Sequence, residues 1–142
     1  MDELLPRRGL TFPVVADTMV ASAERIVEDP KGAAFFLLLH TQVKWGAASM
    51  EKVREQLLSR NNNGPYHAFI RAIENDIAHG RVRADVNAVS VATVSMAIWN
   101  GLVRSKIEKF LQCDLCWTLK RSYDAMWRSI AVVAAAEAEK QI

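Results

Sequence analysis

The two cysteines of the chain have the spacing found in redox-active dithiols and in half of a zinc site. Cys113 and Cys116 are separated by Asp and Leu, which makes a C-x-x-C pattern. A structural zinc ion needs four ligands, and the sequence has no second C-x-x-C and no H-x-x-x-H to complete the set. A thioredoxin-type site requires a βαβ context, which this sequence lacks. The pattern therefore favours two ordinary cysteines at a helix junction and predicts no metal site, and a redox role for the pair is left open.

The three histidines do not form a catalytic set. His40, His67 and His79 are far apart in the sequence. Asp76 and His79 can meet on one helical turn, but a bound metal would need a third ligand from elsewhere. A histidine at the end of a helix is better explained as a favourable partner of the helix dipole. No G-x-S-x-G motif supports a nucleophilic serine, and no glycine-rich loop is present to hold a phosphate. The sequence therefore predicts a protein that is not an enzyme and has no cofactor.

Large aromatic residues recur on the helices expected in the first two thirds of the chain. They are Phe35, Phe36, Trp45, Tyr66, Phe69 and Trp99. Core packing explains any one of them, but as a group beside a few polar residues they suit a cavity for an apolar or aromatic small molecule. The candidate ligand-binding residues are Phe36, His40, Trp45, Phe69, Ile73, Trp99 and Asn100.

Helical periodicity over most of the chain predicts an all-α fold, a bundle of about six helices. No segment alternates with period two for long enough to be a strand. Proline and capping residues mark several starts, and the expected helices span 13–28, 30–45, 49–60, 65–79, 88–103 and 114–140. The second helix carries the run Phe35–Leu39, which is apolar on every side and is expected to lie inside the bundle. The third is expected to be mostly exposed.

Residues 70–105 contain the most specific signals. Ile70, Ile73 and Ile77 recur on one helical face, and Gly80 follows where a left-handed cap is needed. After a short charged bridge, Asn87 is placed to cap the next helix.

That next helix carries a stripe of small residues, spaced four apart, at Thr93, Ala97, Gly101 and Ser105. Such a stripe lets another helix approach closely, and Gly101 costs about 1 kcal/mol of helix propensity relative to alanine. We therefore expect the last two helices to form a four-helix bundle with a second copy of the chain. The predicted interface residues are Thr93, Ala97, Gly101, Ser105, Tyr123, Met126, Trp127, Ile130 and Ala134.

This stretch resembles the ligand-binding and dimerisation domain of tetracycline-repressor-like (TetR) transcriptional regulators. An amphipathic helix ends at glycine, a V-R-A-D bridge follows, and an alanine-rich helix ends in N-G-L; the matching residues are Ile73, Ile77, Gly80, Val82, Arg83, Asp85, Val86, Ala92, Gly101 and Leu102. The resemblance implies that residues 13–142 form an effector-binding and dimerisation domain, preceded by a flexible lead or linker remnant at 1–12. In such a regulator, the bound effector changes the spacing of two DNA-reading heads and releases the operator.

The chain differs from that family at its N-terminus. Those regulators carry an N-terminal helix-turn-helix domain, and the residues before Pro13 are too few to hold one. DNA binding is therefore expected only through a domain absent from this chain. The rival hypothesis is a purely structural helical dimerisation module with a solid core and no ligand.

Composition fits a single globular domain. The 142 residues are 51% hydrophobic and 24% charged, and a formal charge of +2 does not indicate a nucleic-acid-binding surface. The short basic clusters, Arg7–Arg8 and Lys106 with Lys109, favour solvated surface. No apolar run approaches the roughly 18 residues of a membrane span, and residues 1–10 lack the apolar core of a signal peptide. We expect a soluble, cytoplasmic protein with no membrane partner.

Overall fold

The computed structural model describes residues 10–59 and 62–132 of the chain. Within these ranges it contains six α-helices and no β-strand, which confirms the all-α prediction. The helices are α1 (Phe12–Glu28), α2 (Pro30–Thr41), α3 (Glu51–Leu58), α4 (Pro65–Ala78), α5 (Ala88–Ile107) and α6 (Leu115–Ile130), and the 3-10 turn η1 (Ala48–Met50) precedes α3. None of the helices described is long and apolar enough to cross a membrane.

Most helix starts, and the end of α4 before Gly80, lie where the sequence predicts them, because the capping residues act as expected. Asp29 accepts a hydrogen bond from the amide of Lys31, Asn87 accepts one from Ser90, and Gly80 has a positive φ of 73°. The second helix ends earlier than predicted, at Thr41.

The last helix is predicted to continue to residue 140, but it stops before residue 131. Helix α6 ends at Ile130, because Ala131 adopts an extended conformation and forms an isolated antiparallel bridge with Val82. The predicted interface residue Ala134 lies outside the described residues, as do Arg7 and Arg8.

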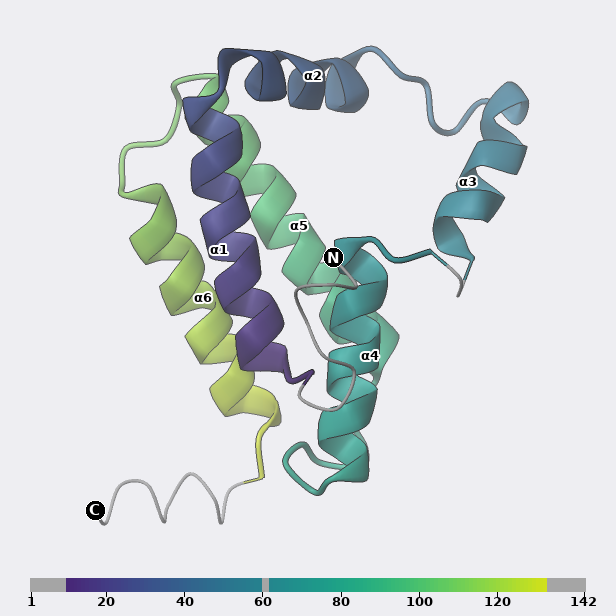
Figure 1. Cartoon of the computed structure of the whole chain (residues 1–142), viewed down its shortest axis with the longest axis vertical. Helices are drawn as coiled ribbons and strands as arrows, with labels where there is room; N and C mark the ends of the chain where they lie inside the picture. The colour runs from purple at the N-terminus through teal and green to yellow at the C-terminus, as the bar shows by residue number, and fades with distance from the viewer. Residues whose placement is uncertain (1–9, 60–61, 133–142) are drawn as a thin grey trace.

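The core is built where α1 packs against α4, α5 and α6 (Figure 1). Phe12 at the start of α1 contacts Phe69 of α4 at 5.5 Å and Tyr123 of α6 at 6.2 Å between ring centroids. Farther along α1, the indole N–H of Trp99 on α5 donates to the main-chain oxygen of Met19 at 2.8 Å. These contacts fix α5 and α6 side by side.

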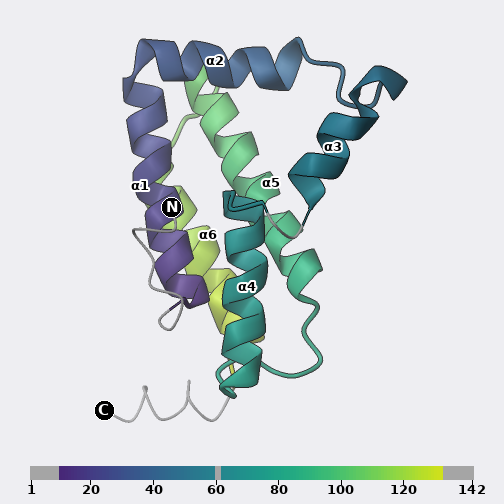
Figure 2. The same ribbon diagram turned by 45° about the vertical axis from the view of Figure 1, so that its right-hand side comes forward.

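Helix α2 lies across the ends of α1 and α5, and α3 stands apart from α1 and α6 in both views (Figure 2). The prediction that the apolar run of α2 lies inside the bundle is wrong. Only Phe36 is buried, whereas Phe35 is 61% and Leu38 is 49% exposed, because α2 rests on the bundle with one side only. Helix α3 contains no buried residue, which confirms its predicted exposure.

Candidate dimerisation face

The outer surface between α5 and α6 forms a shallow, open groove of about 450 Å³. It is lined by small and apolar side chains without a formal charge, namely Ala97, Ile98, Gly101, Leu102, Ser105, Thr118 and Ser122. Three of the four residues of the predicted small stripe lie here, and the fourth, Thr93, is exposed one turn before Ala97. The structure therefore places the whole stripe at or beside a solvent-facing groove.

Gly101 leaves the backbone of α5 uncovered in the middle of this groove. A Cβ atom placed on Gly101 would meet no atom within 4 Å, so nothing within the chain requires glycine at this position. Glycine in a helix interior is less favourable than alanine by about 1 kcal/mol. This cost is explained if a second helix backbone approaches α5 closely at Gly101.

Small residues also follow one side of α6, and two of them, Thr118 and Ser122, line the groove. Thr118, Ser122, Ala125 and Ser129 follow one another at steps of four, three and four residues, which places them on one side of the helix. Ala125 and Ser129 are exposed, and the other two are partly buried. We define the α5–α6 face as this series together with Ala97, Gly101 and Ser105 of α5.

The hydroxyl groups of α6 on this face already have partners within their own helix. Thr118 donates to the carbonyl oxygen of Asp114 at 2.6 Å, and Ser122 donates to that of Thr118 at 2.8 Å. Ser129 donates to the carbonyl of Met126 at 2.6 Å. Because these donors are satisfied locally, covering them with another protein surface leaves no hydroxyl donor unpaired.

Charged and aromatic groups occur close to this face on α6. The guanidinium of Arg121 lies 5.2 Å from the ring centroid of Trp117, which is itself 60% exposed. Tryptophan and arginine are residue types that protein–protein contacts favour.

The predicted interface residues of α6 pack against the core of this chain. Tyr123 and Ile130 are buried in the core of this chain, and the Tyr123 hydroxyl donates to the carbonyl of Ser95 at 3.1 Å. Trp127 is partly buried and stacks on Phe12, with 6.0 Å between centroids. Met126, also partly buried, places its sulfur 3.8 Å from the Ser95 hydroxyl. The large apolar side chains of α6 thus pack against other helices of the same chain.

The small residues of α6 on this face are therefore not among the predicted interface residues. The available signal was the series Thr118, Ser122, Ala125 and Ser129, which repeats the small-residue spacing of α5. The large apolar residues of α6 form a stronger amphipathic pattern than this series, and they dominate a prediction made from periodicity.

The predicted ligand-binding residues fall into separate groups. The first is an aromatic cluster in which the Phe36 ring lies 4.0 Å from His40 and 5.7 Å from Trp99. Phe69 and Ile73 are fully buried in the core around Phe12. The remaining two, Trp45 and Asn100, are partly buried.

The polar groups of the first cluster are bonded to the main chain. The Trp99 indole donates to Met19, and the Nδ1 atom of His40 lies 2.8 Å from the carbonyl oxygen of Phe36. Trp45 likewise donates to the carbonyl of Leu39 at 2.8 Å. None of the seven predicted residues lines the α5–α6 groove.

The cysteine and histidine side chains do not gather into a reactive cluster. Both cysteines are free, and burial, followed by the carboxylates of Glu24, Asp114 and Glu28, raises the pKa of Cys116 above the ordinary thiol value. A protonated thiol is a poor nucleophile and a poor metal ligand. Among the residues that the structure describes, no group of three or more His, Cys, Asp and Glu side chains is placed to hold a metal ion.

No family model, no curated protein and no solved structure matches this chain.

Proposed function

We propose that this chain is a homodimerisation domain in which α5 and α6 of two copies pack as a four-helix bundle around a two-fold axis. The observation that carries this proposal is the uncharged, small-residue face with Gly101 bare at its centre. Small side chains on both helices let four helices approach closely, and a two-fold axis brings the same face of each copy together.

We propose that this dimer is part of a TetR-like transcriptional regulator, because residues 70–105 resemble the ligand-binding and dimerisation domain of that family. Three features of that resemblance are present in the structure: the glycine cap of α4, the short bridge, and the long helix α5 that carries Gly101. In such a protein the DNA contacts belong to a helix-turn-helix domain outside this chain, and the protein acts in the cytoplasm. Dimerisation then sets the distance between two DNA-reading domains, as it does for helix-turn-helix dimers in general.

An apolar effector is supported by the surface of α2 and α3. Within residues 10–59 and 62–132, five of the ten exposed large hydrophobic residues lie on these two helices: Phe35, Leu38, Val53, Leu57 and Leu58. Exposed apolar side chains that gather on one helix, as Phe35 and Leu38 do on α2, can form a contact site for an apolar molecule or another protein. An effector bound against α2 would lie on the helix that carries Phe36 and His40 of the aromatic cluster.

Sedimentation velocity tests the dimer. We expect the wild-type chain to be a dimer at micromolar concentration, and Gly101→Leu to be a folded monomer because its side chain occupies the space of the partner helix. Glu74→Leu, which adds the same side chain at an exposed position of α4, should remain a dimer. A wild-type monomer at this concentration, or a dimeric Gly101→Leu with wild-type affinity, would contradict the proposal.

A thermal-shift screen tests the effector. Apolar and aromatic compounds that bind the native state should raise the melting temperature by mass action and change the tryptophan emission. The shift should be lost in Phe35→Ser and Leu38→Ser and kept in Gly101→Leu, which separates ligand binding from dimerisation. If no compound shifts the melting temperature, the ligand-free dimerisation module is the better description.

A further inference from the structure

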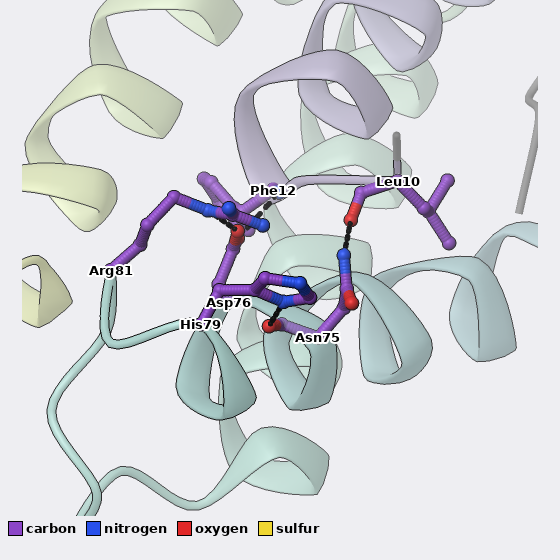
Figure 3. Close-up of polar contacts among 6 residues, drawn as sticks. All are labelled: Leu10, Phe12, Asn75, Asp76, His79 and Arg81. Atoms are coloured by element: carbon purple, nitrogen blue, oxygen red, sulfur yellow. Dashed lines mark hydrogen bonds and ion pairs between the residues drawn. The ribbon is translucent and has the colours of Figure 1, made fainter. Parts of the chain in front are cut away.

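A fully buried carboxylate lies at the end of the molecule where the chain enters α1 and leaves α6. Asp76, near the C-terminus of α4, is 0% exposed. Its Oδ2 atom accepts a hydrogen bond from the amide of Phe12 at 2.9 Å, and its Oδ1 atom accepts one from Nε of Arg81 at 2.7 Å. Figure 3 shows both donors converging on this single side chain. Each carboxylate oxygen therefore has its own partner from a different segment.

The first of these contacts acts as a helix cap supplied from 64 residues away. Thr11 occupies the N-cap position of α1, but its side chain makes no capping hydrogen bond. The amides of the first helical turn have no partner within the helix, and a negative charge there is favoured by the helix dipole. Asp76 provides both the acceptor and the charge. Beside it, the Asn75 amide donates to the carbonyl of Leu10 at 2.8 Å, so two consecutive residues of α4 hold the chain on both sides of Thr11.

The second contact leads to the other end of the chain. Arg81 binds Asp76 through its side chain, and its carbonyl oxygen accepts a hydrogen bond from the amide of Val132 at 3.0 Å. The amide of Arg83 donates to the carbonyl of Ile130 at 3.1 Å, which completes the bridge between the α4–α5 turn and the end of α6. A continuous path of hydrogen bonds therefore runs from Phe12 through Asp76 and Arg81 to Val132.

We propose that Asp76 and Arg81 form a clasp that couples the segment entering α1 to the segment leaving α6, so that releasing one loosens the other. The coupling follows from the burial of Asp76, because loss of the Phe12 amide leaves a buried carboxylate oxygen without a donor, and loss of Arg81 leaves the buried charge uncompensated. The hydrogen bond that Asp76 keeps is then part of a less stable structure, and it opens more often. The clasp does not rest on the proposed dimer. A domain attached before Leu10, as the TetR resemblance implies, would take its orientation from α4 and α6 through these contacts.

Amide hydrogen exchange of the 142-residue chain, followed by NMR, tests the coupling. Val132→Pro removes the amide that donates to Arg81 and tolerates the extended conformation of Ala131 before it. We expect exchange of the Phe12 amide to be at least about tenfold faster in this variant, which corresponds to about 1.4 kcal/mol. Val132→Ala keeps the amide and should leave Phe12 unchanged, and the amides of α5 should be unchanged in both variants.

The reverse experiment perturbs the clasp and observes the far end. Arg81→Gln should accelerate exchange at Phe12 and Val132 together, whereas Glu74→Gln, at an exposed position two residues before Asp76, should affect neither. Unchanged exchange at Phe12 in Val132→Pro would show that the two segments open independently. Uniform acceleration along α4 and α5 in that variant would show loss of the whole fold. Either result would overturn the clasp.

Discussion

Gly101→Ala should change the stability of the fold and the stability of the dimer in opposite directions. Within one chain the new methyl group meets no atom within 4 Å, so it introduces no clash. Alanine is favoured over glycine in a helix interior by about 0.5–1 kcal/mol. For a domain of this size, such a gain raises the melting temperature of the monomer by roughly 2–5 °C.

In the dimer the same methyl group lies where two helix backbones meet. Adding a methylene-sized group to a well-packed contact costs about 1–3 kcal/mol. The dissociation constant of the dimer should therefore increase by roughly 5- to 150-fold. Substitution of a residue that affects only the fold of its own chain would not stabilise the monomer and weaken the dimer at the same time.

Two measurements separate the effects. Urea unfolding at a concentration well below the dissociation constant reports the monomer, and sedimentation equilibrium over a range of concentrations reports the dimer. Gly46→Ala is the matched control, because its new Cβ also meets nothing within 4 Å but lies in the loop after α2. This control should leave dimer affinity unchanged.

Two outcomes would refute the reasoning. If Gly101→Ala stabilises the monomer and leaves the dissociation constant at the wild-type value, the partner does not approach α5 at this position. If the variant destabilises the monomer, the space beside Gly101 is not open in solution, and the structural basis of the α5–α6 face fails.

Three further predictions concern single buried or partly buried groups. Trp99→Phe removes the hydrogen bond to α1 and should lower the free energy of unfolding, measured with urea, by about 1–3 kcal/mol. Burial raises the pKa of Tyr123, so its contribution to stability is complete below the ordinary phenol pKa of about 10 and is lost as the pH rises above it. In Tyr123→Phe the free energy of unfolding should therefore decrease less between about pH 10 and 11 than it does in the wild type. Iodoacetamide at neutral pH should modify the exposed Cys113 before Cys116, whose pKa is raised, and equal rates by mass spectrometry would contradict this.

The helices could be predicted from the sequence because their boundaries depend on local chemistry. Asp29, Asn87 and Gly80 act through atoms within two or three residues of themselves, so their effect can be deduced without knowing the fold. The exposure of α2 could not be deduced in this way. Its apolar run is the same whether the helix is surrounded or rests on the bundle with one side, and only the packing of α1 and α5 decides between these arrangements.

The two sides of α6 show why interface residues are harder to predict from a sequence than helices are. Large apolar residues such as Tyr123 satisfy the pattern of an interface and of a core equally well. The structure resolves this ambiguity because α1 covers the large side chains and leaves Ala125 and Ser129 outside. Asp76 posed a different difficulty. Its sequence neighbourhood indicated His79 as a partner, whereas its actual partners include the amide of Phe12, which no periodicity connects to it.

Phe12 connects the clasp to the α5–α6 face. Its amide is held by Asp76, and its ring packs between Phe69 of α4 and the Tyr123 and Trp127 rings of α6. The residue that the clasp fixes is therefore also the residue against which the inner side of α6 rests. Because α6 is a rigid helix, the position of its inner side determines the direction of its outer side. Phe12 thus links the buried carboxylate of α4 to the helix that carries half of the α5–α6 face, although Asp76 belongs to neither helix of the proposed dimer.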